Sequence, residues 1–382
     1  MLLTIFISRV YSADFCKAKH NIPTPMANKK LRFISIVTDP GLLTPRHSYL
    51  KKDKLGVWNC NEDDNNGFRT RIAPSLQYRH YHQVVDPLYA EYPKNCRWSD
   101  LTVQGRKNSF ELGEIYRTYL VKNLKHIPEK MNPRIFRFFS APDECSFHSA
   151  QSFLNGFYPP LSDNEILSIE TADEKNSPLM VSQSMCQDLN NNYKQFIASQ
   201  KYNNFYNEAK KVTDAAVKSL GVDPTPSNTV NVCKWAMAMS CNDESTLPKE
   251  FTKDVLQKCL EVSRFETLHF YLSNSTAAAA PFFNHFFKYS DKAIGLNMHV
   301  KVNYQAARNN VIAAICSLIN FDGDIPIGSH MAIEIWEDTV PDQYIRFVLN
   351  GDEIFTQRYD IFRANIESKI EGVCSEQDIY DE

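Results

Sequence analysis

The sequence predicts an α/β fold, in which a central mixed sheet is flanked by helices and carries an inserted, mostly helical cap subdomain. Short apolar stretches at 31–37, 135–139, 299–305 and 331–337 have the length and composition of buried strands. Apolar residues recur with helical spacing between the first two strands, and a long, more polar helical pattern separates the second strand from the third. With 382 residues, 43% of them hydrophobic, the chain is long enough for a large core and a second subdomain.

The N-terminal residues have two interpretations. Residues 1–10 are mostly apolar and precede Tyr11-Ser12-Ala13, a pattern typical of a short signal peptide covering residues 1–13. Arg9 interrupts the apolar stretch and no basic segment precedes it, so a buried N-terminal strand is the alternative.

Two segments, 31–160 and 297–360, are expected to form the α/β core. The strand at 31–37 ends in a loop with Pro40 and Gly41, and residues 106–125 carry apolar groups at helical spacing. The strand at 135–139 is followed by a helix at about 148–155, which completes a βαβ-like unit. After the third strand, 311–319 is typical of a core helix, and 330–357 is expected to hold two more strands.

The intervening residues 161–290 are expected to form the helical cap. Helical patterns cover 184–219, 228–240 and 251–263, and Ser275 is a candidate N-cap for a further helix. Residues 361–382, rich in acidic groups near their end, are expected to be a C-terminal tail.

Composition excludes some classes of function and favours a compartment. The net charge of −3 and the lack of a basic stripe argue against a nucleic-acid partner, and no later stretch is long and apolar enough to cross a membrane. The ten cysteines form no Cys-x-x-Cys pair, so we expect neither a metal site nor a cofactor. Scattered cysteines fit disulfides in an oxidising compartment, although buried thiols are the alternative. Asn274-Ser275-Thr276 is a candidate glycosylation sequon.

Several stretches, in order along the chain, together resemble one family of phosphatases. They are Asp39-Pro40-Gly41-Leu42-Leu43-Thr44-Pro45, then Leu101–Tyr119 with its Glu-Leu-Gly, then Ser149-Ala150-Gln151 continuing to Pro160, and finally Pro326–Glu337 with Ser-His and Glu-Ile-Trp-Glu. These resemble motifs of the histidine acid phosphatases, branch 2 of the histidine phosphatase superfamily. The resemblance covers about residues 30–360 and implies a phosphoglycerate mutase-like fold.

The resemblance also implies which positions would carry catalysis, and these positions hold unsuitable residues. In the family a histidine attacks phosphorus, arginines clamp the phosphate oxygens and an aspartate protonates the leaving group. Here the nucleophile position is Pro40, the arginine positions are Asp39, Leu43, Phe139 and Cys145, and the late His-Asp pair becomes Arg308-Asn309. The sequence therefore predicts a degenerate member without catalytic residues. We expect Asp39, Phe139 and Arg308 to converge at the carboxyl ends of the strands, with Asp143 and Glu144 nearby, and Arg308 to be a candidate ion-pair partner of Asp39.

Two alternatives stay open at this stage. Arg46-His47 could be a displaced catalytic pair, and an active acid phosphomonoesterase could use His47, His148 and Arg308. A different hydrolase in the same cleft is the other alternative. A degenerate member would instead bind an unidentified ligand or protein, and a homodimer is one assembly that the sequence allows.

The resemblance further implies a disulfide and a location. A family cysteine equivalent to Cys186 pairs near the C-terminus, which here indicates Cys374, and Cys60 could pair with Cys96. Together with the N-terminal pattern, this favours a secreted protein or one of the endolysosomal lumen.

Overall fold

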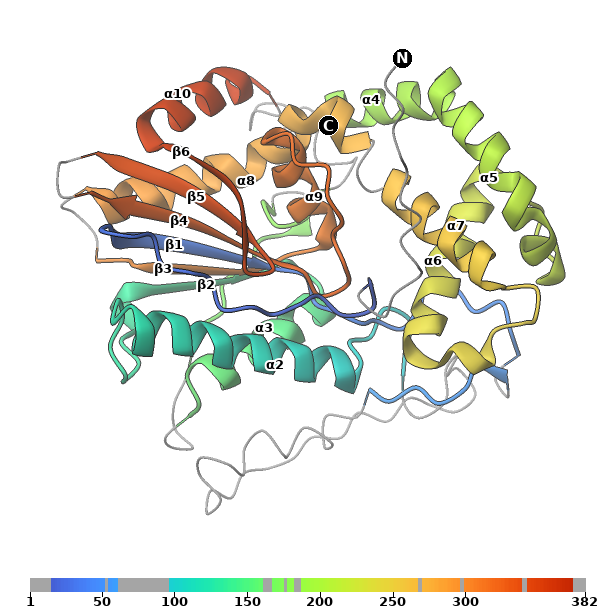
Figure 1. Cartoon of the computed structure of the whole chain (residues 1–382), viewed down its shortest axis with the longest axis horizontal. Helices are drawn as coiled ribbons and strands as arrows, with labels where there is room; N and C mark the ends of the chain where they lie inside the picture. The colour runs from blue at the N-terminus through green and yellow to red at the C-terminus, as the bar shows by residue number, and fades with distance from the viewer. Residues whose placement is uncertain are drawn as a thin grey trace.

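The computed structural model describes residues 15–51, 54–60, 96–160, 167–174, 177–181, 187–266, 270–295, 299–338 and 342–373. A six-stranded sheet has the order β2-β3-β1-β4-β5-β6, and helices cover both of its faces (Figure 1). The strands are β1 Lys30–Thr38, β2 Phe136–Ser140, β3 Val302–Ala306, β4 His330–Glu337, β5 Gln343–Leu349 and β6 Asp352–Arg358. Strands β1, β2 and β3 are parallel, whereas β4, β5 and β6 add in antiparallel fashion, so the predicted mixed sheet is confirmed.

One face of the sheet is covered by α2 Val103–Arg117 and α3 Glu144–Phe157. Two glycines let these helices approach closely: a Cβ on Gly113 would lie 2.1 Å from the Phe153 carbonyl oxygen, and one on Gly156 would lie 2.1 Å from that of Phe110. The helices close over Ile34 and Ile36 of β1, which belong to the same core cluster as α2 and α3 side chains.

The other face is covered by α8 Phe270–Ile294, α9 Asn309–Leu318 and α10 Tyr359–Ile370. α8 packs against α9 and β1, and the Phe33 ring of β1 lies 6.0 Å from that of Phe286. The last helix predicted for the cap is therefore a layer of the core. Ser275, the candidate N-cap, lies inside α8, because the helix begins at Phe270.

The remaining helices gather beyond one end of the sheet (Figure 1). They are α4 Gln187–Ala198, α5 Gln200–Ser219, α6 Pro226–Asp243 and α7 Lys253–Arg264, with one-turn or π-helical segments η4 Thr118–Asn123, η5 Pro133–Ile135 and η8 Glu244–Thr246 elsewhere along the chain. Ser199 separates α4 from α5 by accepting a hydrogen bond from the Tyr202 amide as an N-cap.

Two predictions for the C-terminal part were wrong. Residues 330–357 hold three strands rather than two, because Asn350 and Gly351 adopt positive φ angles of 54° and 96° and turn the chain back into β6. The predicted tail from residue 361 begins as α10, which buries Phe362, Ile366 and Ile370 against the sheet.

A buried ion pair links β4 to β5 and gives Glu334 and Trp336, of the late Glu-Ile-Trp-Glu motif, a structural role. Arg346 Nε donates to Glu334 Oε2 at 2.8 Å, and Glu334 also accepts from the Tyr119 hydroxyl at 3.0 Å and from Trp336 Nε1 at 2.8 Å. Both charged side chains are at least 95% buried, so each needs the other.

Three disulfides join described residues: Cys16–Cys241, Cys60–Cys96 and Cys233–Cys259. Cys60–Cys96 is a pair that the sequence suggested, whereas Cys186 and Cys374 lie outside the described residues. Asn274 lies in α8, and the structure does not describe its side chain. Three disulfides fit an oxidising compartment.

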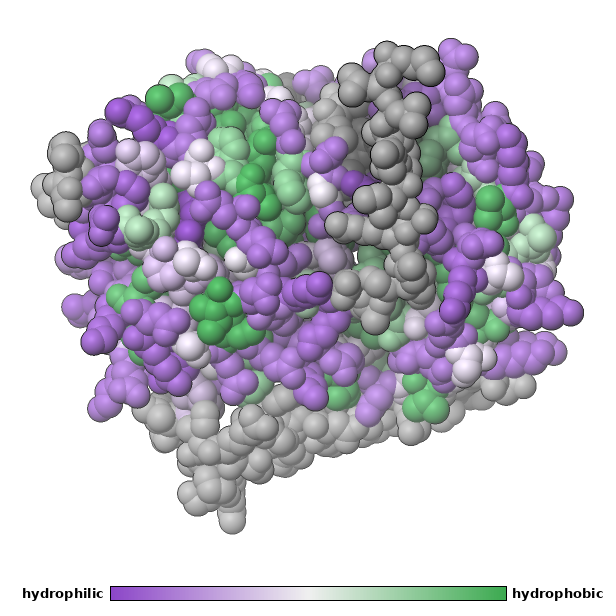
Figure 2. Space-filling model, viewed as in Figure 1, coloured by the Kyte–Doolittle hydropathy of each residue, from purple (hydrophilic) through white to green (hydrophobic). Residues whose placement is uncertain are grey.

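Hydrophilic residues predominate on the face shown in Figure 2, and hydrophobic ones form small patches between them. Among the described helices, none combines the length and the apolar character that a membrane span requires.

Candidate functional site

The carboxyl ends of the three parallel strands bring the candidate site residues to one edge of the sheet. Thr38 and Ser140 both pair with Ala306, so the residues that follow these strands leave the sheet at the same level. Asp39 follows β1, Phe139 lies near the end of β2, and Arg308 is the N-cap of α9 directly after β3. Residues more than 160 positions apart in sequence therefore meet here, as the motif order predicted.

The loop after β1 is fixed between β4 and α2. The Asp39 amide donates to the Ser329 carbonyl at 2.9 Å, and the Asp39 carboxylate accepts from the Gly328 amide at 2.8 Å. Gly41 has a φ angle of 101°, and a Cβ there would lie 3.3 Å from Gly105 Cα, so only glycine fits both the turn and the contact. Pro40 is buried, and its carbonyl accepts from the Ser109 hydroxyl at 3.4 Å.

Asp39 is a carboxyl group whose surroundings oppose its charge. Burial raises the pKa of Asp39 to about 6, although the amides of Gly328, Gly41 and Asn309 and the positive charge of Arg308 counteract the rise. Asp39 is therefore ionised at neutral pH and largely neutral in acid.

Arg308 pairs with Asp143 instead of the expected partner Asp39. Its Nε donates to Asp143 Oδ2 at 3.1 Å, and the two side chains are 24% and 17% exposed. Asp143 is also the N-cap of α3 and accepts from the Ser146 amide at 2.9 Å. Burial alone would raise the pKa of Asp143, but Arg308 and the hydrogen bonds from Cys145 and Ser146 outweigh it and lower that pKa. Asp143 lies at the N-terminus of α3 because it caps that helix, and Arg308 forms its ion pair with Asp143 at this position.

Cys145, which the sequence resemblance aligns with an arginine of the family, is a buried thiol whose surroundings favour the protonated form. It is buried and donates to Asp143 Oδ1 at 2.8 Å. Burial raises the pKa of Cys145, and the negative charges of Asp143 and Asp39 raise it further. A protonated thiol is neither a nucleophile nor a substitute for a guanidinium.

The other residues that the resemblance aligns with catalytic positions have packing or surface roles. The Phe139 ring packs at 4.7 Å from His285 and at 5.4 Å from Tyr289, both on α8. Leu43 pairs with Leu101 in an isolated bridge, and Asn309 is exposed in the first turn of α9. Glu144 is exposed and bonds to Arg97, which also pairs with Asp100.

The two alternative histidines take up separate surroundings. His47 is exposed, and its ring lies 6.4 Å from that of Tyr49, which in turn packs on Trp235 of α6. His148 lies on α3, where its Nδ1 is 2.9 Å from a guanidinium nitrogen of Arg106 on α2.

Sequence reasoning missed Arg106 and Ser109, two buried residues of α2 beside the loop that follows β1. Arg106 is only 6% exposed, and Ser109 Oγ lies 3.0 Å from Ser149 Oγ of α3. The signal was available, because both residues lie within the segment that starts at Leu101, one helical turn apart and on the side of α2 that contains Gly105. Within the described residues, no group of His, Cys, Asp or Glu side chains is arranged to hold a metal ion.

Comparisons with known proteins agree with this architecture. The family model "Histidine phosphatase superfamily (branch 2)" matches residues 51–350, which begins after β1 and the Asp39–Pro45 loop. Counting factor 60 of Dictyostelium discoideum is 21% identical over 372 residues, which are 91% of this chain and 87% of that protein. A probable acid phosphatase of the same organism is 24% identical over 257 residues, 63% of this chain and 49% of that protein.

Solved structures extend the similarity to the fold. The phytase of Citrobacter braakii has a TM-score of 0.63 at 12% identity, covering 91% of this chain and all of that chain. A Bifidobacterium longum multiple inositol polyphosphate phosphatase, in complex with inositol hexasulfate, has a TM-score of 0.54 at 10% identity, covering 90% and 93%. Together with the family match over most of the described core, these findings show that the chain belongs to branch 2 of the histidine phosphatase superfamily.

Proposed function

We propose that this chain is a catalytically inactive, exported member of its family that binds a ligand or a partner. The feature that carries the proposal is Pro40, which the resemblance aligns with the family's nucleophile and which is buried in the loop after β1. A proline amide nitrogen carries no proton and no available lone pair, so it cannot attack phosphorus. The absence of a nucleophile alone commonly costs on the order of 10⁴ to 10⁶ in rate.

Charge at the same edge supports the proposal. A phosphate dianion beside Asp39 and Asp143 would meet two carboxylates and one guanidinium, and that guanidinium is already paired with Asp143 at 3.1 Å. One unfavourable charge pair at 4 Å costs roughly 4 kcal/mol at an effective dielectric near 20. Acid removes part of this repulsion, because the pKa of Asp39 is about 6, but it supplies no nucleophile.

The alternative is an active acid phosphomonoesterase that uses His47, His148 and Arg308. Three observations weigh against it: His47 is exposed, His148 is engaged with Arg106, and Arg308 with Asp143. Export, into a secreted or endolysosomal location, is part of the proposal and is supported by the three disulfides.

Hydrolysis of p-nitrophenyl phosphate from pH 3 to pH 8 tests the proposal. We expect the purified full chain to show no turnover above buffer, while an active phytase of the family serves as the positive control. The Pro40→His variant should remain inactive, since the clamping arginines and the acid are still missing. Turnover by the wild-type chain that disappears in a His47→Ala variant would identify Arg46-His47 as a working catalytic pair and overturn the proposal.

A further inference from the structure

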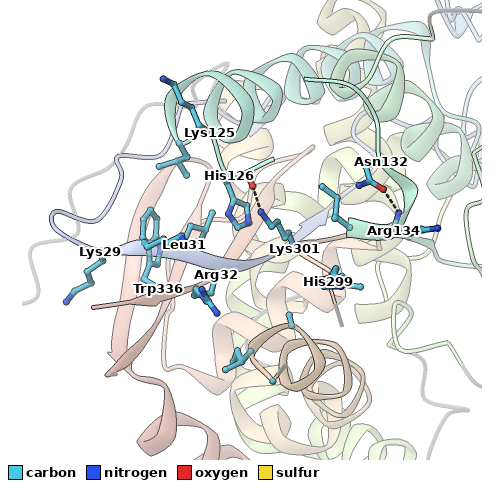
Figure 3. A pocket seen from close by; sticks show the side chains of 17 residues that line it. Lys29, Leu31, Arg32, Lys125, His126, Asn132, Arg134, His299, Lys301 and Trp336 are labelled. Carbon is cyan, nitrogen blue, oxygen red and sulfur yellow. Dashed lines mark hydrogen bonds between the residues drawn. The ribbon is translucent and has the colours of Figure 1, made fainter. Parts of the chain in front are cut away.

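The opposite edge of the sheet holds a cavity of about 820 Å³, where β1, β2 and β3 begin (Figure 3). Its walls come from the start of β1, the residues after η4, the start of η5, the end of α8 and the residues just before β3. Because the three strands are parallel, this cavity and the Asp39–Arg308 edge lie at opposite ends of the same strands. Its volume is typical of sites for small molecules.

The lining of this cavity is strongly basic. Of its 17 lining residues, two are histidines, none is acidic, and six are cationic: Lys29, Lys30, Arg32, Lys125, Arg134 and Lys301. Two of the six have a carboxylate neighbour on the residues after Trp336, since Lys29 pairs with Asp338 at 2.5 Å and Arg32 lies 3.5 Å from Glu337 in a partly exposed pair. For the other four, the described residues supply no carboxylate within 4.0 Å. The cavity therefore keeps a positive charge.

A buried histidine, His126, lines the cavity among these cations. His126 is 9% exposed, its carbonyl accepts from Lys301 Nζ at 2.9 Å, and its Nε2 has no hydrogen-bond partner among the described residues (Figure 3). Burial lowers the pKa of His126 to about 4, and the positive charges of Lys301, Lys30 and Arg32 add to the effect. Burial, with Lys30 and Arg32, also lowers the pKa of Lys301. The positive charges of Lys30, Arg32 and Lys301 repel one another, and a negative charge inside the cavity would offset that repulsion.

Scattered surface lysines are usually solvated and need no ligand. Lys30, Lys125 and Arg134 are exposed, but this cluster differs because its cations surround a cavity and because Lys30, Arg32 and Lys301 act on a buried imidazole. Lys and Arg are the side chains that bind phosphate and sulfate groups best, through charge-assisted hydrogen bonds. The cations come from β1, from the segments before β2 and β3, and from the loop after η4, so they surround the space from several sides. One phosphate group contacts two or three such side chains and would leave the others without a counter-charge.

We propose that this cavity binds a small polyanion that carries two or more phosphate or sulfate groups. Binding needs no hydrolysis and no residue of the Asp39–Arg308 edge, so it does not depend on the proposed function. An anion in the cavity neutralises Lys30, Arg32 and Lys301 together and removes the positive field around His126.

Isothermal titration of the full chain with inorganic tripolyphosphate tests the proposal. We expect binding that weakens at least tenfold between 50 and 200 mM salt. A Lys30→Gln, Arg32→Gln double variant should lose a further tenfold or more. Lys210→Gln with Lys253→Gln is the matched control, because it removes the same charge from exposed cap positions and should bind within about twofold of wild type. Orthophosphate should bind at least tenfold more weakly than tripolyphosphate.

Three outcomes would overturn the proposal: no binding at 1 mM tripolyphosphate, an equal loss in the control variant, or orthophosphate binding as tightly as tripolyphosphate. Should the double variant fold poorly by circular dichroism, nuclear magnetic resonance of the wild-type histidines decides instead. Saturation with tripolyphosphate should then shift the His126 ring signals and leave those of the exposed His47 unchanged. Shifts confined to other histidines would count against this cavity.

Discussion

The two ends of the parallel strands differ in how their charges are balanced. At the carboxyl end, Arg308, Asp143 and Asp39 form a small group in which an ion pair of 3.1 Å satisfies the cation and a carboxylate is left over. At the amino end, six cations line one cavity and only two have carboxylate partners among the described residues. The carboxyl end, where the resemblance to the family would place phosphate, therefore has less uncompensated positive charge than the amino end.

The largest effect should come from breaking the ion pair at the carboxyl end. Arg308→Ala leaves Asp143 half-buried without its cation, which should lower the free energy of unfolding by about 2–3 kcal/mol at pH 7. The pKa of Asp143 is lowered in the folded state, so the ion pair stabilises the fold fully at pH values above the unfolded pKa of about 4. The destabilisation caused by Arg308→Ala should therefore shrink as the pH falls through the folded pKa of Asp143. Urea unfolding at pH 7 and pH 3 measures both.

Two variants serve as controls for that experiment. Arg308→Lys keeps the charge and should lose less than Arg308→Ala, whereas Arg358→Ala breaks an exposed pair with Asp360 and should change little. Equal destabilisation by Arg308→Ala at pH 7 and pH 3 would show that packing, rather than charge, holds this edge together.

The next effect has the opposite sign. Asp39→Asn removes a carboxylate whose ionisation burial disfavours, while its amide oxygen can still accept from Gly328. Because the folded pKa is about 6 and the unfolded one near 4, ionised Asp39 destabilises increasingly from pH 4 to pH 6 and fully above pH 6. The variant should gain about 2 kcal/mol at pH 7 and nothing at pH 4.

Thermal unfolding across that pH range measures the Asp39 effect, with Asp352→Asn as an exposed control that should show no such gain. A variant that is less stable than wild type at pH 7 would mean that the carboxylate is needed as an acceptor in this loop.

A smaller stabilisation should appear when the amino end is occupied. At a concentration tenfold above its dissociation constant, tripolyphosphate should raise the free energy of unfolding by about 1.4 kcal/mol. The rise should persist in Arg308→Ala and vanish in the Lys30→Gln, Arg32→Gln variant, as thermal unfolding with and without ligand would show. The reverse pattern would move anion binding to the carboxyl end.

The smallest effect concerns thiol chemistry at the carboxyl end. Cys145 and Cys316 are both buried, and burial raises the pKa of each, so neither should react with iodoacetamide in the native protein at pH 8. Mass mapping should find both labelled only after denaturation. Selective native labelling of Cys145 would reveal a reactive thiol beside Asp143 and reopen the question of a different hydrolase.

Sequence reasoning predicted the strands and their convergence well, because apolar strands and turn residues are local signals. The four predicted core strands agree with β1, β2, β3 and β4 to within about three residues at each end. α8 was assigned to the cap because it lies within 161–290, the stretch expected to form the inserted helical subdomain, and only tertiary packing reveals that this helix contacts β1 and α9.

The charge partners could not be predicted in the same way. Asp39 and Arg308 were expected to pair because their strands end at the same edge of the sheet. Asp143 instead lies at the N-terminus of α3 as its N-cap, and the Arg308 guanidinium donates to Asp143. The basic cavity was missed altogether, since its cations come from four separate segments, and the short run Lys29-Lys30-Leu31-Arg32 does not reveal that Lys125, Arg134 and Lys301 lie beside it.

The most direct test of this account is a crystal structure of the full chain soaked in tripolyphosphate, because one experiment reports on both ends of the sheet. We expect density for the ligand between Lys30, Arg32 and Lys301, and an unchanged Arg308–Asp143 pair. Ligand density beside Arg308 and Asp39, with the amino-terminal cavity unfilled, would contradict the proposal that the amino end is the anion site.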